Sequence, residues 1–73
     1  MNKDEVAKLV GAKLRAIRIE SSLSIEALAL ESGIDYTQIS RIELGKINTS
    51  LYQIYKLART LNVSVSEITH VLP

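Results

Sequence analysis

The chain has no cysteine and only one histidine among its 73 residues. Without cysteine there is no disulfide framework, no thiolate zinc site and no thiol nucleophile. His70 stands alone, and the sequence contains neither a Gly-rich phosphate loop nor a carboxylate pair suited to acid–base catalysis. These absences exclude the common catalytic and metal sites, so we expect no enzyme, no metal and no cofactor.

Long apolar runs are also missing. No stretch approaches the ~20 residues of a membrane-spanning helix, and the start Met-Asn-Lys-Asp-Glu lacks the pattern of a secretory signal. We therefore expect a cytoplasmic protein with no membrane partner. Hydrophobic residues make up 47% of the chain, too many for a disordered segment, and the length suits one domain over residues 1–73 with one small core.

Charge of either sign is nearly balanced, with a formal net charge of only +1. Bases exceed acids by two within residues 1–20 and again within residues 35–60. Acids exceed bases by two within residues 21–34 and by one within residues 61–73. Any electrostatic attraction to nucleic acid must therefore come from a local patch and not from the whole surface.

Apolar residues recur at helical spacing along the chain, which predicts an all-α fold of five helices. The apolar positions of the first helix, over residues 3–20, are Val6, Leu9, Val10, Leu14 and Ile17. Those of the fourth, from a cap at Thr49 or Ser50 to about residue 60, are Leu51, Ile54, Leu57, Ala58 and Leu61. A capping box at residues 64–67 opens a short fifth helix, whose apolar residues are Val65, Ile68 and Leu72.

Residues 24–43 predict two short helices joined by a tight turn. Ser24 can cap the first helix, and Gly33 can end it in the left-handed conformation. Asp35 can cap the second helix, with Gln38 reaching back as in a capping box. Ala29 is small, as two steeply crossing helices require at their contact. The pattern indicates a helix-turn-helix; the alternative is two ordinary packing helices of an all-α domain.

The second of these helices, over about residues 35–43, has two distinct sides. At 100° per residue, Ile39 and Ile42 define its buried side. The remaining surface carries hydroxyl, guanidinium and amide groups, from Tyr36, Thr37, Gln38, Ser40 and Arg41. Such donors and acceptors suit the edges of bases in the major groove of DNA, although a plain solvated face has the same composition.

Two charged residues fall near the buried stripes of their helices. Arg18 follows Leu14 and Ile17 at helical steps, and Glu43 falls beside the buried side of its helix. A pair between them would join the first helix to the third by charge-assisted hydrogen bonds; the alternative is two independent exposed charges. In the loop over residues 44–50, Lys46 and Asn48 are positioned to contact phosphate.

Taken together, these positions resemble the lambda-repressor/Cro-type helix-turn-helix of the Xre family. The resemblance covers about residues 11–68, and its most specific block is Ile39-Ser40-Arg41-Ile42-Glu43 followed by Gly45-Lys46 and Asn48. It implies a five-helix lambda-repressor-like DNA-binding domain whose third helix enters the major groove. It also implies a two-fold homodimer on paired half-sites about 34–36 Å apart.

The resemblance assigns roles to particular positions. It implies DNA contacts from Ser24, Tyr36, Thr37, Gln38, Ser40, Arg41, Lys46 and Asn48. Arg41 is expected to donate two bonds to guanine. The same resemblance favours a structural ion pair of Arg18 with Glu43.

Departures from the family pattern occur at apolar positions. Ile25 replaces a glutamine that often touches the DNA backbone, so Ser24 and backbone N–H groups would have to hold that phosphate. Leu30 and Leu44 stand where polar residues are more usual. They are either scattered apolar surface or part of a contact with a partner.

The function predicted is that of a sequence-specific DNA-binding transcriptional regulator, a repressor acting as a homodimer. Surplus apolar area on the last two helices and the tail predicts a dimer interface at Tyr52, Tyr55, Val71 and Leu72. The roles of antitoxin with a toxin partner, restriction-modification controller and phage-type repressor stay open. The alternative is a protein-interaction module that keeps the fold without binding DNA, which an apolar patch from Leu44 across Thr37 would favour.

Overall fold

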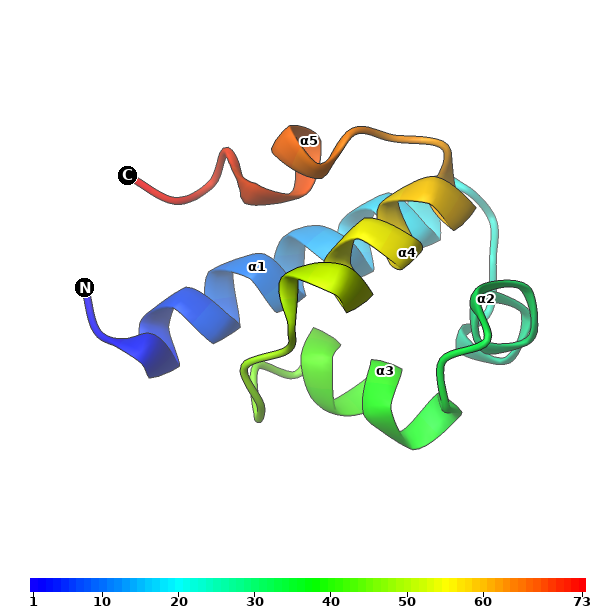
Figure 1. The fold of residues 1–73 in the computed structure, drawn as a ribbon, viewed down its shortest axis with the longest axis horizontal. Coiled ribbons are helices and arrows are strands. Elements are labelled where there is room, and N and C mark those ends of the chain that lie inside the picture. Colours follow the sequence, from blue (N-terminus) through cyan, green and yellow to red (C-terminus); the bar gives the residue numbers. More distant parts are fainter.

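Five helices and no strands make up the computed structural model, which describes residues 1–73 (Figure 1). They are α1 (Lys3–Glu20), α2 (Ile25–Ser32), α3 (Tyr36–Glu43), α4 (Leu51–Leu61) and α5 (Val65–Thr69). No helix is long and apolar enough to cross a membrane. The all-α five-helix architecture predicted from the sequence is confirmed.

A side-chain cap starts each helix. The oxygens of Asn2, Ser24, Asp35, Ser50 and Ser64 accept hydrogen bonds from backbone N–H groups in the first turns of the helices that follow them. The caps satisfy donors that a helix leaves free at its start, and they fix where each helix begins. At the end of α2, Gly33 takes the left-handed conformation with φ of +73°.

The core lies where α1, α2, α3, α4 and α5 converge. Its largest fully buried side chains are Leu14, Leu28, Ile39, Ile42, Leu57 and Ile68. Each such side chain stabilises the fold by about 1.5–3 kcal/mol through removal of apolar surface from water. Helix α1 packs against α3 and α5, and α2 packs against α3 and α4. Every helix therefore contributes at least one side chain to a single apolar cluster.

Helices α1 and α3 approach each other closely at Gly11. A Cβ atom there would lie 2.1 Å from the carbonyl oxygen of Ile42 and 2.9 Å from that of Glu43. Only a residue without a side chain fits, since real Cβ atoms need more than 3 Å. The contact seats the C-terminal half of α3 against the middle of α1.

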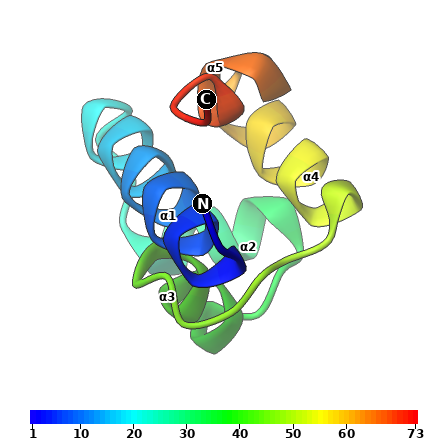
Figure 2. The same ribbon diagram turned by 90° about the vertical axis from the view of Figure 1, so that its left-hand side faces the viewer.

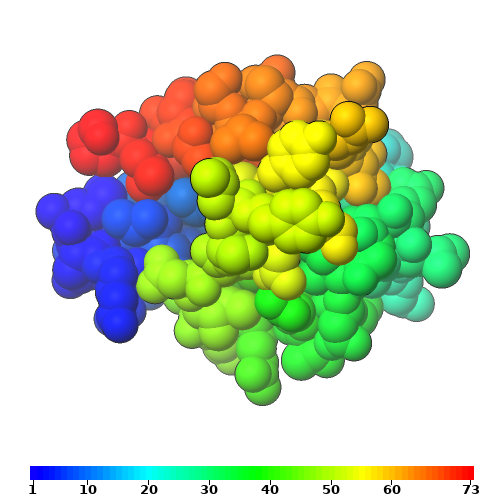
Figure 3. Space-filling view, in the orientation of Figure 1, coloured from blue at the N-terminus to red at the C-terminus, as the bar shows by residue number.

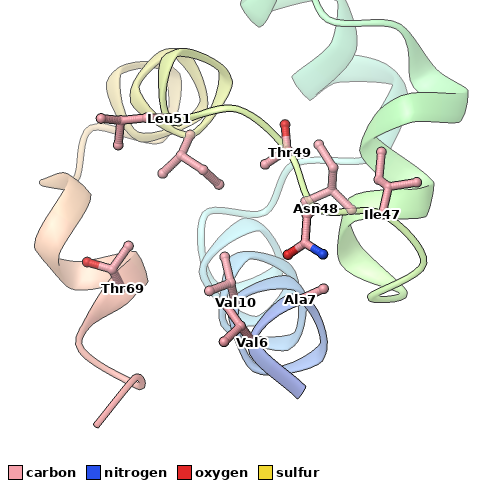
Figure 4. A pocket seen from close by; sticks show the side chains of 10 residues that line it. Val6, Ala7, Val10, Ile47, Asn48, Thr49, Leu51 and Thr69 are labelled. Carbon is pink, nitrogen blue, oxygen red and sulfur yellow. The ribbon is translucent and has the colours of Figure 1, made fainter. Parts of the chain in front are cut away.

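Two leucines expected in the apolar stripes are exposed instead. Leu9 follows the buried Ala7 by two residues, about 200° around α1, and so faces solvent. Leu51 begins α4 and is 75% exposed, at the rim of a pocket between α1, the 44–50 loop and α5 (Figure 4). The expectation that α5 carries Leu72 is also wrong, because α5 ends at Thr69.

The views in Figures 1 and 2 place α3 at one edge of the molecule and α5 at the opposite edge. The two chain termini lie at the same end of the molecule in both views. One side of α3 packs on α1 and α2, and its other side is free of protein. The fold thus presents a short rigid helix at its surface.

Candidate nucleic-acid interface

The end of α3 is held by an ion pair with α1. Arg18 Nε donates to Glu43 Oε2 at 2.7 Å, and Arg18 Nη2 donates to Glu43 Oε1 at 2.9 Å. Arg18 Nη1 also donates to the carbonyl oxygen of Leu23, at 2.9 Å, in the segment that precedes α2. One guanidinium therefore joins α1, the α1–α2 connection and the last residue of α3.

Burial makes this pair rigid. Arg18 is 9% exposed and Glu43 is 6% exposed, so water competes little for either charge. The hydrogen bond to the Glu43 carboxylate raises the pKa of Arg18 above its ordinary value, and burial opposes that rise only in part. Two parallel hydrogen bonds restrict the orientation of the two side chains as well as stabilising the pair, so they fix the direction in which α3 points.

The outer side of α3 is polar and accessible. Thr37 and Arg41 are exposed and lie one helical turn apart, and Tyr36 at the start of the helix is 48% exposed. Ser40 is only half-buried, at the edge of this side and not at its centre. Figure 3 shows the green residues of this region along the lower edge of the surface. A guanidinium and a hydroxyl thus share one solvent-facing stripe of a firmly held helix.

A hollow of about 240 Å³ runs beside that stripe. It is lined by Asp35, Thr37, Gln38, Arg41 and Ile47. The structure therefore brings three of the predicted DNA-contacting side chains around one concave surface. The sequence analysis does not single out Ile47; an isoleucine between the polar residues Lys46 and Asn48 was the signal for it.

The other predicted DNA-contacting residues lie outside this hollow. Ser24 is exposed at the start of α2, where its hydroxyl oxygen caps the helix by accepting from Ala27 N at 3.0 Å. Lys46 is exposed in the loop after α3. Asn48 is exposed but lines the separate apolar pocket against α1 (Figure 4).

The sequence predicted a capping box in which Gln38 reaches back to Asp35. That prediction is wrong. The Asp35 carboxylate accepts from Thr37 N at 3.0 Å, while Gln38 Nε2 donates to Gln53 Oε1 of α4 at 2.6 Å. Thr49 Oγ1 donates to the same oxygen at 2.5 Å. The sequence reading missed Gln53, because no local pattern reveals a partner 15 residues away.

The predicted dimer residues form two groups. Tyr52 and Tyr55 are exposed on α4, with stacked rings whose centroids are 6.5 Å apart. Val71 and Leu72 are half-buried after the end of α5. Their role as an interface stays a prediction.

Exposed leucines flank the interface without forming its centre. Leu30 is 86% exposed on α2, and Leu44 is 58% exposed at the end of α3. On the stripe that leads to Leu44, the positions one and two turns earlier are Arg41 and Thr37, both polar and exposed. The α3 face is therefore not a continuous apolar stripe.

Comparison with known proteins agrees with this geometry. The helix-turn-helix family HTH_3 matches residues 14–68. The control protein C.BamHI of Bacillus amyloliquefaciens is 38% identical over 66 residues, which cover 89% of this chain and 82% of that protein. The control protein C.MunI of a Mycoplasma species is 39% identical over 59 residues, 80% of each chain.

A solved structure shows the same fold. The restriction-modification controller protein C.AhdI from Aeromonas hydrophila superposes with a TM-score of 0.83 at 37% identity, over 85% of this chain and 94% of that one. The chain therefore belongs to the helix-turn-helix family HTH_3, a non-enzymatic family of DNA-binding transcription regulators.

Proposed function

We propose that the protein is a restriction-modification controller that binds a specific operator through α3. The observation that carries the proposal is the exposed Thr37–Arg41 stripe on a helix whose end is fixed by a buried ion pair. Similarity to C.BamHI, C.MunI and C.AhdI over most of each chain supports the controller role over that of an antitoxin or a phage-type repressor. No toxin partner is needed in this role.

The contacts divide into base reading and phosphate positioning. Arg41 donates two hydrogen bonds to guanine, and Thr37 and Tyr36 meet neighbouring base edges, with Gln38 and Ser40 beside them. Ser24, Lys46 and Asn48 contact phosphates, which fix the register of α3 but carry no sequence information. Their exposure in the structure supports this division for every residue except Gln38 and Ser40, which are half-buried.

The operator is bound by a homodimer. Two-fold pairing through Tyr52, Tyr55, Val71 and Leu72 would set two α3 helices about one turn of DNA apart, 34–36 Å. The exposure of both tyrosines supports this surface. Sedimentation at micromolar concentration, with and without operator DNA, tests it; a strict monomer under both conditions would refute it.

The test of DNA recognition starts by selecting bound sites from random duplex DNA. Fluorescence anisotropy on the selected site then compares the wild type with Arg41→Ala and Lys46→Ala. Arg41→Ala should cost about 1–3 kcal/mol at one base position, while Lys46→Ala should weaken all sequences equally. Failure of the wild type to enrich any sequence would reject the proposal.

The biological role is tested separately from DNA binding. A controller is expected to regulate genes for a restriction endonuclease and its methyltransferase, so the neighbouring genes are informative. A toxin gene beside this one would favour the antitoxin role instead. Reporter expression from the adjacent promoter, with wild type and Arg41→Ala, measures whether regulation depends on α3.

A further inference from the structure

Gln53 joins three segments of the fold through one oxygen atom. Its Oε1 accepts from Gln38 Nε2 of α3 at 2.6 Å and from Thr49 Oγ1 of the loop at 2.5 Å. The bond from Gln38 is the one hydrogen bond between α3 and α4. The link therefore connects the DNA-facing helix directly to the helix behind the loop.

The Gln53 side chain does not make the capping-box bond that its position at the start of α4 allows. Residues 50–53 have the capping-box pattern, and Ser50 Oγ accepts from Gln53 N at 3.1 Å. The return bond, in which the backbone N–H of Ser50 would donate to the Gln53 side chain, is absent, whereas the boxes at the starts of α1 and α5 are closed. The amide instead holds a side chain of another helix.

The amide oxygen of Gln38 has no partner in the protein and is accessible. A glutamine amide carries two N–H donors and one oxygen with two acceptor sites. Both acceptor sites of Gln53 are occupied, and one N–H of Gln38 is used. No side-chain polar atom in the protein is both buried and unpartnered, so the Gln38 oxygen reaches solvent.

The groups left on Gln38 match one base. Gln38 lines the hollow together with Thr37 and Arg41, on the side of α3 proposed to meet DNA. With one N–H held by Gln53, its amide presents one oxygen acceptor and one N–H donor. These are the groups with which a glutamine binds the N6 amine and N7 of adenine in the major groove.

We propose that Gln53 is a positioning residue that fixes the Gln38 amide in the orientation that reads adenine. Gln53 itself touches no base; it acts by holding one N–H of Gln38, and Thr49 holds Gln53 in turn. The inference rests on the proposed function, since it concerns specificity within the same DNA interface. It moves part of the specificity of the recognition helix onto a residue of α4.

The experiment measures base preference at each position of the selected operator by anisotropy, using duplexes with every single substitution. The wild type and Gln38→Ala together identify the position read by Gln38, where we expect adenine to be preferred by about tenfold. Gln53→Met removes both acceptor sites at similar side-chain length and should lower that preference at least about threefold, leaving the other positions unchanged. Gln53→Ala is a second variant that adds no bulk, should the methionine disturb folding.

Two further variants separate positioning from other roles. Gln53→Glu keeps an oxygen that accepts from Gln38 and Thr49, so it should retain the adenine preference. Thr49→Val removes one of the two donors and should weaken the preference partly. Thr60→Val is its matched control on α4, because the Thr60 hydroxyl donates only to the Lys56 carbonyl, and it should have no effect.

Each outcome bears on the proposal. Unchanged adenine preference in Gln53→Met and Gln53→Ala overturns it. Loss of the adenine preference in Gln53→Glu also overturns it, because that side chain keeps an oxygen that can accept from both Gln38 and Thr49. If the wild type selects no site, the proposed function fails as well. If it selects a site and the Gln53 variants keep the wild-type adenine preference, only the role of Gln53 is rejected.

Discussion

The substitution Glu43→Ala probes how α3 is held in place. It removes two hydrogen bonds and leaves the guanidinium of Arg18, a residue 9% exposed, with the Leu23 carbonyl as its remaining partner. Breaking a buried ion pair from one side costs about 3–5 kcal/mol, mainly because the other charge stays buried and uncompensated. A 73-residue domain has a total stability of about 4–11 kcal/mol, so the loss is a large fraction of it.

Urea unfolding followed by circular dichroism at low temperature measures the loss. In a thermal scan a loss of about 3 kcal/mol corresponds to a fall in Tm of about 12–24 °C for a domain of this size. The double variant Arg18→Met/Glu43→Leu replaces the pair by apolar groups and should lie within about 2 kcal/mol of the wild type, on either side. Because the pKa of Arg18 is raised in the folded protein, the arginine is charged at all pH values below its ordinary pKa. Its contribution to the free energy of unfolding is complete there and is lost only as the pH rises above that range. The arginine therefore adds no pH dependence between pH 6 and pH 8.

The reasoning is refuted if Glu43→Ala costs less than about 1 kcal/mol, the value expected of an exposed pair. It is also refuted if the double variant is as unstable as the single one. That result would mean that the shape of the site, and not the unpaired charge, dominates the energetics. Glu43→Gln provides an intermediate case, because its amide oxygen can still accept one of the two bonds.

Three further substitutions test the packing. Gly11→Ala should destabilise the fold by more than about 2 kcal/mol in urea unfolding, because the new Cβ would lie 2.1 Å from the Ile42 carbonyl oxygen. The same exchange in an exposed helix stabilises by about 1 kcal/mol. A gain in stability would therefore contradict the α1–α3 contact. Gly33→Ala should cost only about 1–2 kcal/mol, since its Cβ would meet only the flexible end of Lys56, at 4.0 Å, and the cost comes from the φ of +73°. A cost similar to that of Gly11→Ala would reveal a clash absent from the structure. Leu30→Gln should change the unfolding free energy by less than about 0.5 kcal/mol, because the side chain is 86% exposed; a large loss would indicate that Leu30 is covered.

Local chemistry accounts for the success of the helix predictions. The caps at Ser24, Asp35 and Ser64 are short-range hydrogen bonds between residues two or three apart, so the order of residues alone reveals them. The buried stripe of Ile39 and Ile42 follows from helical periodicity in the same way. These features depend only on residues that are close together in the sequence, so they can be predicted without the tertiary structure.

Periodicity was a poorer guide at the ends and edges of helices. Leu9 and Leu51 were assigned to buried stripes and are exposed, because burial requires another helix opposite the residue as well as an apolar side chain. At Leu51 the neighbouring elements leave a pocket unfilled. Whether a surface is covered depends on how five helices pack, and no single helix carries that information.

What the sequence alone determined is the set of five helices, the caps of α2, α3 and α5, and the polar side of the recognition helix, since each arises from contacts within a few residues. Only the tertiary structure decided how that helix is held: the bidentate geometry of Arg18 with Glu43, the backbone contact at Gly11 and the link from Gln38 to Gln53. These contacts join residues 15 to 32 positions apart, and their geometry exists only once the helices have packed around a common core.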